Sequence, residues 1–165
     1  MLLSIIKNEY HRRIIEEGLA RITYCLSKLS EEEIWYRNNA NCNSIGNIIM
    51  HLEGNVRQYI FAGIGVHKDI RTRDMEFDNK NRLDYKALLE KLSNTLHDSY
   101  EIINNLSIEN LTENRKVQGF NETVMSIIIH VIEHFSYHVG QITFYTKSTK
   151  DIDTKYYDGL DLNAT

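Results

Sequence analysis

The stretch His130-Val-Ile-Glu-His134-Phe-Ser-Tyr-His138-Val-Gly-Gln141 repeats a histidine at every fourth residue within an apolar run. On a helix, residues four and eight positions apart lie nearly above one another on one face. The stretch therefore predicts a helix with a ladder of three imidazoles where an apolar core stripe would be expected. Because a buried imidazole is costly unless its nitrogen atoms find partners, we interpret the ladder as part of a metal site.

A single metal ion can bind only two adjacent histidines of this ladder. The outer two, His130 and His138, are about 12 Å apart along a helix axis, at a rise of about 1.5 Å per residue. Spacing favours the pair His134 and His138 over the pair His130 and His134 only mildly. The third ligand must then come from another helix, and His51 is the best candidate because apolar residues flank it in the middle of a predicted helix. The alternative interpretation is that the histidines are hydrogen-bonded core residues.

Four long segments show the 3.6-residue apolar period of amphipathic helices. We predict helices over residues 4–29, 44–62, 85–106 and 123–146, joined by connectors that include residues 66–82 and 107–121. A capping box at Ser30 and Glu33 predicts a further helical turn, Gly18 indicates close packing, and Trp35 is interpreted as a plug over one end. The fold class is therefore all-α, a four-helix bundle formed by a single domain over residues 1–165. A polar tail over residues 147–165 carries three candidates for docking onto the helices: Tyr156, Tyr157 and Leu160.

The composition excludes several function classes. The chain has 165 residues, of which 42% are hydrophobic and 25% charged, and its net charge is −4. Because it has no long block of lysine and arginine, non-specific nucleic-acid binding is not expected. The sequence predicts no signal peptide, and no apolar run approaches the roughly 18 residues that span a membrane. Two cysteines, Cys25 and Cys42, form no disulfide framework, which favours a cytoplasmic location.

The predicted ligand set also excludes two well-known metal sites. No histidine is preceded by glutamate at the third position before it, as carboxylate-bridged di-iron bundles require. The His-Glu-x-x-His pattern of zinc proteases is absent as well. Three histidines without a fourth protein ligand describe an open site, which is typical of catalytic rather than structural zinc.

The sequence resembles the DinB/YfiT-like superfamily over nearly its whole length. The resemblance is carried by Gly46-Asn-Ile-Ile-Met-His51-Leu-Glu-Gly-Asn55 together with the histidine ladder, in the same order. An Arg-x-Arg-Asp-x-Glu-Phe connector, here residues 71–77, is similar to that of one branch of small bacterial DinB-like proteins. The resemblance implies an up-down-down-up four-helix bundle. Because such proteins are often homodimers, the resemblance also implies a homodimer.

The resemblance also implies which residues hold the metal. A divalent ion is expected on His51, His134 and His138, while His130 corresponds to a companion residue that lines the pocket or supports a ligand. Zinc and nickel both suit imidazole ligands. Further candidates for orienting ligands or contacting substrate are Asn47, Tyr137 and Gln141, by their places beside the histidines.

Characterised relatives in the superfamily include metal-dependent transferases of bacillithiol, mycothiol or glutathione. We therefore expect an enzyme in which the metal binds a low-molecular-weight thiol as its thiolate, which then attacks an electrophile. Two alternatives remain: a metal-dependent hydrolase, with Glu53 or Glu133 as a possible base, and a non-catalytic metal-binding stress-response bundle. Family resemblance does not choose among them, because one fold serves many reactions.

Overall fold

The computed structural model describes residues 1–78 and 82–164, and residues 79–81 of the predicted 66–82 connector lie outside that description. The chain is mostly helical, with one small two-stranded sheet. This confirms the helical class expected from the apolar periodicity. Among the described residues, no helix is long and apolar enough to cross a membrane.

The first long helical segment is continuous from α1 (Leu2–His11) through the π-helical η1 (Arg12–Leu19) to α2 (Ala20–Leu26). Gly18 lies against Phe135, and a Cβ at Gly18 would approach the Phe135 ring to 2.6 Å, so the predicted close packing is confirmed. The short helix α3 (Glu31–Ile34) begins with the predicted capping box. Trp35 is buried behind it and its indole nitrogen donates to the carbonyl of Leu83 at 3.1 Å, as expected of a packing residue.

The second long segment is α4 (Ile45–Val56), extended by the π-helical η2 (Arg57–Ile64). Ser44 caps it, because the Ser44 hydroxyl accepts from the backbone of Asn47 and the Asn47 side chain reaches back to the backbone of Ser44. The described part of the connector that follows contains one short 3₁₀ helix, η3 (Arg73–Glu76). The third long segment, α5 (Tyr85–Asn104), is capped by Asp84.

The predicted connector over residues 107–121 leads into a β-hairpin, which was not predicted from the sequence. After a 3₁₀ turn, η4 (Glu109–Thr112), the strands β1 (Asn114–Val117) and β2 (Phe120–Thr123) pair antiparallel, with Val117 opposite Phe120. Gln118 and Gly119 form its two-residue turn with φ of 50° and 86°. Positive φ at both positions is the geometry of tight hairpin turns, and glycine adopts it without steric cost.

The last long helix, α6 (Val124–Lys150), is one turn longer than predicted and ends at Asp151, which has a left-handed conformation. The tail therefore begins at residue 151 rather than 147. Tyr156 docks it, since the Tyr156 hydroxyl lies 3.1 Å from that of Thr143 and 3.3 Å from the sulfur of Cys25. By contrast, Leu160 remains exposed.

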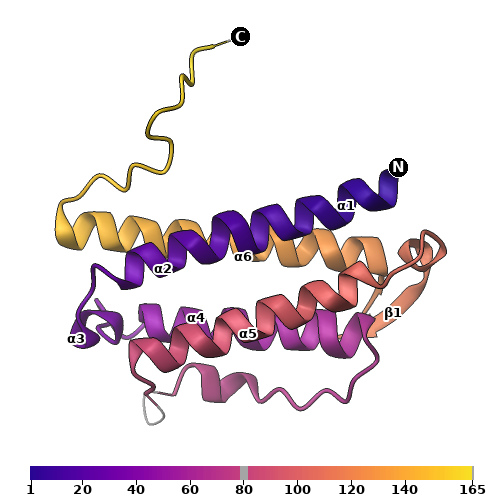
Figure 1. Cartoon of the computed structure of the whole chain (residues 1–165). Coiled ribbons are helices and arrows are strands. Elements are labelled where there is room, and N and C mark those ends of the chain that lie inside the picture. Colours follow the sequence, from indigo (N-terminus) through magenta and orange to yellow (C-terminus); the bar gives the residue numbers. More distant parts are fainter. Residues whose placement is uncertain (79–81, 165) are drawn as a thin grey trace.

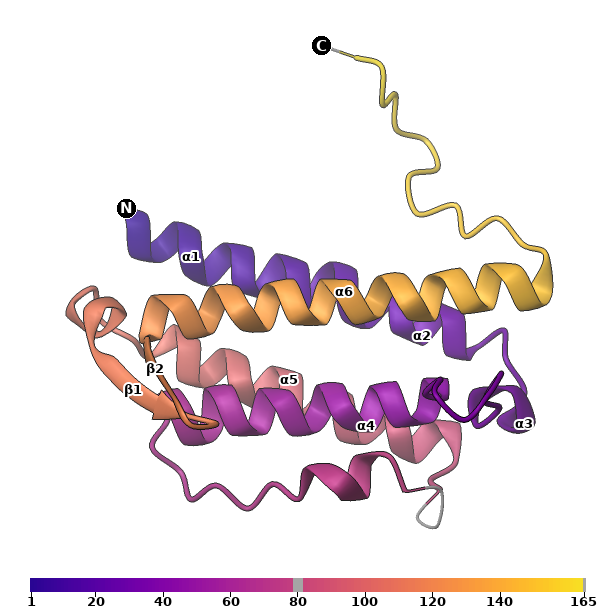
Figure 2. The same cartoon turned by 180° about the vertical axis from the view of Figure 1, so that it is seen from behind.

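The long helical segments are arranged so that α6 lies beside the first segment while α4 lies beside α5 (Figures 1 and 2). The first segment and α6 run in one direction, and α4 and α5 run in the other (Figure 1). Buried apolar side chains from all four fill the space between them, among them Tyr10, Leu52, Leu96 and Phe135. This packing brings the middle of α4 against the middle of α6, where both elements carry histidines.

Candidate metal centre

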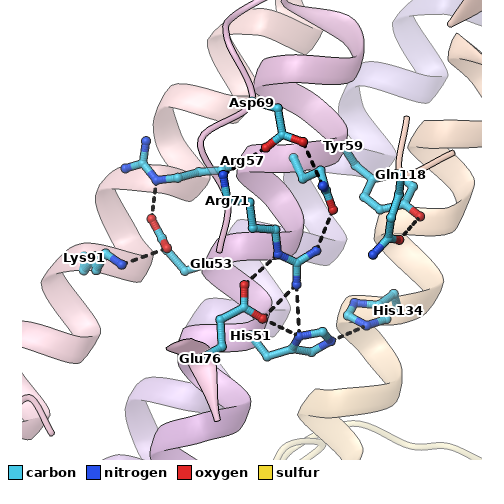
Figure 3. A network of polar contacts seen from close by, with 11 residues as sticks. His51, Glu53, Arg57, Tyr59, Asp69, Arg71, Glu76, Lys91, Gln118 and His134 are labelled. Atoms are coloured by element: carbon cyan, nitrogen blue, oxygen red, sulfur yellow. Dashed lines mark hydrogen bonds and ion pairs between the residues drawn. The ribbon is translucent and has the colours of Figure 1, made fainter. Parts of the chain in front are cut away.

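Three histidines meet between α4 and α6. His51 comes from α4, and His134 and His138 come from successive turns of α6; one ring nitrogen of each lies within 4.8 Å of the others. The Nε2 atoms of His51 and His134 are only 3.1 Å apart (Figure 3). His51 is buried and the other two are half-buried. This group of histidines, called the histidine cluster below, could hold a metal ion.

The ring of His51 is oriented by Glu76, which arrives from η3 in the connector. The Nδ1 atom of His51 lies 2.9 Å from a carboxylate oxygen of Glu76. A carboxylate can only accept, so this shorter contact puts the proton on Nδ1 of His51 and leaves a lone pair on its Nε2 for the cluster. The guanidinium of Arg71, which can only donate, lies 3.1 Å from the same Nδ1 atom and competes with that arrangement. A hydrogen bond from the second ring nitrogen to a carboxylate is the usual arrangement around metal-bound histidine.

Glu76 is itself held by Arg71. The guanidinium of Arg71 donates to both Glu76 oxygens, at 2.6 and 2.8 Å, and Figure 3 shows it in contact with both Glu76 and the ring of His51. Burial alone would raise the pKa of the Glu76 carboxyl, but the hydrogen bonds from Arg71 and His51 outweigh it and lower the pKa below its ordinary value. Glu76 therefore stays charged and keeps accepting from His51.

Two residues of α4 make room for Glu76 and hold its backbone. The Asn47 side chain donates to the carbonyl oxygen of Glu76 at 2.9 Å, so Asn47 contacts the support of His51 rather than the cluster itself. At Gly54, a Cβ would lie 2.1 Å from a Glu76 carboxylate oxygen. Glycine is therefore needed at this position for the carboxylate to approach α4 so closely.

Gln141 plays the corresponding role for His138. The side-chain oxygen of Gln141 lies 2.7 Å from Nδ1 of His138, one turn back along α6. Because an amide oxygen accepts, this contact puts the proton on Nδ1 and leaves Nε2 of His138 free. Burial lowers the pKa of His138, and although the Gln141 contact opposes that effect, the net direction is downward.

His134 is the least satisfied member of the cluster. Its Nδ1 atom is buried and has no hydrogen-bond partner within the described part of the chain. Burial, with the nearby His138, His51 and His130 adding to it, lowers the pKa of His134 to about 3. At neutral pH, the His134 imidazole is therefore uncharged, and its Nε2 lies 3.1 Å from Nε2 of His51.

The donor set fits a divalent transition metal. Neutral imidazoles with free Nε2 lone pairs are the form that zinc and related ions bind. Without a metal, the two Nε2 atoms of His51 and His134 can share one proton in a hydrogen bond, and a cation between them would take the place of that proton. No other histidine, cysteine or acidic residue completes such a group with these three among residues 1–78 and 82–164.

His130 and Tyr137, two further candidates from the sequence, lie beside the cluster. The His130 ring stacks on Tyr59 with centroids 4.4 Å apart and on His134 at 5.7 Å. The Tyr59 hydroxyl in turn donates to Gln118 of the hairpin at 2.8 Å (Figure 3). Tyr137 is exposed and meets His138 edge to face at 5.1 Å.

Neither carboxylate considered as a base lies in the cluster. Glu53 is buried, but its oxygens accept from Arg57, Lys91 and Thr95. Glu133 is exposed on α6. Sequence reasoning missed Arg71 and Glu76, although both belong to the connector motif. Chemistry could have pointed to Glu76, because the second ring nitrogen of a metal-binding histidine usually donates to a carboxylate or a carbonyl.

Comparison with known proteins gives one result. A family model described as "Protein of unknown function (DUF1572)" matches residues 8–158. A search of curated proteins found no match. Residues 8–158 contain the whole histidine cluster and the connector that supports it.

Proposed function

Because the chain belongs to the DUF1572 family, whose description names no activity, we propose its function from the histidine cluster: a divalent-metal-dependent enzyme of the DinB-like superfamily. The reaction proposed is S-transfer from a low-molecular-weight thiol of the bacillithiol type to an electrophile. Zinc or nickel is the proposed metal, since both suit a three-imidazole site.

The arrangement of the long helical segments supports the superfamily assignment. The first segment and α6 run one way and α4 and α5 the other, which corresponds to the up-down-down-up four-helix bundle that the resemblance implies (Figure 1). The ligands would then come from the second and fourth helices of the bundle, His51 from one and His134 and His138 from the other. The same resemblance leads us to propose that the protein forms a homodimer.

One observation carries the proposal of catalysis rather than non-catalytic metal binding: three histidines converge, and no fourth protein ligand joins them in the described chain. A divalent ion held there would lower the pKa of a thiol that binds at the remaining position. Other side chains orient the ligands: Glu76 fixes the orientation of His51, and Gln141 fixes that of His138. Burial lowers the pKa of His134 and of His138, which favours their uncharged, metal-binding form.

The experiment combines metal analysis with a thiol assay. Purified protein is expected to contain about one zinc or nickel ion per chain, and to accelerate the reaction of a thiol with monochlorobimane. His134→Ala should abolish both the bound metal and the acceleration, because it removes one ligand of three. His97→Ala changes an exposed histidine of α5 and should affect neither.

The outcomes separate the proposal from its rivals. A protein that binds no transition metal, even after metal is added, contradicts the site and the reaction together. A protein that binds metal through His134 but is inert toward thiols and electrophiles points to the non-catalytic metal-binding alternative. Cleavage of esters without a thiol would instead identify a hydrolase.

A further inference from the structure

A cavity lies next to the Arg71–Glu76 pair, on the side of α4 that faces α5 and the connector. Its volume is about 490 Å³, and its lining comes from α4, η2, the connector with η3, and α5. Cavities of roughly 300–1,000 Å³ are the usual size for small-molecule sites. The cavity does not include any histidine of the cluster, so its contents need not touch the metal.

The charged groups of this cavity leave a positive surplus. Among the described residues, four lysine and arginine side chains line it against three acidic ones, of which only Asp69 is exposed. Arg71 is occupied by Glu76, and the buried Glu53 lies between Arg57 and Lys91, so that one carboxylate serves two cations. Lys68 is exposed and makes no ion pair or hydrogen bond within the described residues.

Two of these cations remain accessible although they are paired. The side chains of Arg57 and Lys91 are each 45% exposed, whereas the Glu53 side chain they share is 6% exposed. The carboxylate of Glu53 is therefore hidden behind its partners, so a ligand in this part of the cavity meets Arg57 and Lys91 rather than Glu53. Neutralising such partly exposed cations is favourable when the anion is held by more than one of them.

Apolar surface lies next to these charges. Met50, Phe61 and Met75 line the cavity, and Ile70 and Met75 on the connector are left exposed to solvent. The guanidinium of Arg57 lies over the Phe61 ring, 5.3 Å from the ring centroid. This is within the roughly 6 Å at which a cation is attracted to an aromatic face. The cavity thus offers a cationic rim and an apolar wall side by side.

We propose that this cavity is a binding site for a small amphiphilic organic anion, whose acidic group lies among Lys68, Arg57 and Lys91 and whose apolar body lies against Phe61 and Met75. Neither the histidine cluster nor a bound metal is needed for it. The site is therefore independent of the proposed S-transferase reaction, and each of the two proposals can fail alone.

Two fluorescent probes test the proposal on the full chain in EDTA. The anion 8-anilinonaphthalene-1-sulfonate and the neutral N-phenyl-1-naphthylamine share nearly the same apolar body, but only the first has a sulfonate. The anionic probe should bind more tightly than the neutral one. Lys68→Glu should weaken the anionic probe about tenfold, as expected when an attractive exposed ion pair becomes repulsive, and leave the neutral probe unchanged.

A second variant and a matched control locate the binding. Met75→Gln, at an exposed position of η3, should weaken both probes because it removes apolar contact surface. Lys147→Glu makes the same charge change at the groove between the first helical segment and α6, and should have no effect on either probe. The proposal is overturned if Lys68→Glu leaves the anionic probe as tightly bound as before, or if Lys147→Glu weakens it instead.

Discussion

At the scale of single residues, the carboxylate of Glu76 decides which nitrogen of His51 can bind a metal. Replacing Glu76 with glutamine keeps its size but allows its amide to donate to Nδ1 of His51, which would favour the wrong tautomer. We expect Glu76→Gln to weaken zinc binding about 10–100-fold. Competition with a chromophoric zinc chelator measures this change. Glu133→Gln makes the same substitution on exposed α6, one residue before His134, and equal affinities in the two variants would contradict the role of Glu76.

The lowered pKa of His134 has a consequence for the metal-free protein. When unfolded, this imidazole takes up a proton near its ordinary pKa of 6.5, but in the folded protein it does so only near about 3. The unfolded state therefore binds more protons below pH 6.5, so the free energy of unfolding falls as the pH drops from about 6.5 toward 3.

Urea unfolding in EDTA between pH 7.5 and pH 5 tests this dependence, since most carboxylates remain charged over that interval. The urea midpoint should fall with pH in the wild-type protein and fall less in His134→Asn, which has no proton to gain. If the urea midpoint falls by the same amount with pH in both proteins, His134 is not protected from protonation.

At the scale of elements, the connector is positioned by the absence of a side chain on α4. In Gly54→Ala, the new Cβ would overlap the Glu76 carboxylate, so that η3 must move away from α4. We expect Gly54→Ala to be less stable than the wild-type protein and to bind zinc about as weakly as Glu76→Gln. Gly140→Ala is the matched control, because no atom lies within 4 Å of its new Cβ. This second change should stabilise α6 by about 0.5–1 kcal/mol without altering zinc affinity. Thermal melts and zinc titrations of both variants provide the measurement.

The elements also show what sequence could and could not predict. Apolar periodicity and capping residues such as Ser44 and Asp84 predicted the long helices, because these signals are local. The hairpin was missed because its strands are four residues long and only Val117 is buried in them. The contact of Glu76 with His51 spans 25 residues and depends on how the connector folds back, which no local pattern records. The spacing of His134 and His138, by contrast, is set by one helix and could be read from the sequence.

At the scale of the whole molecule, the histidine cluster joins two helices that are distant in sequence. His51 and the ladder belong to α4 and α6, which otherwise meet through apolar packing, so a bound ion would cross-link them in the folded state alone. At a free zinc concentration 100 times its Kd, such binding stabilises the fold by about 2.7 kcal/mol. For a chain of this size, the melting temperature should then rise by roughly 5–10 °C.

Differential scanning calorimetry in EDTA and in excess zinc measures this rise. His134→Ala should melt at one temperature in both conditions, because two histidines from different helices hold zinc far more weakly than three. His97→Ala should keep the full shift, since His97 is exposed on α5 away from the cluster. A zinc-dependent rise that survives in His134→Ala would mean that the stabilising ion binds elsewhere, and the cross-link between α4 and α6 would have to be abandoned.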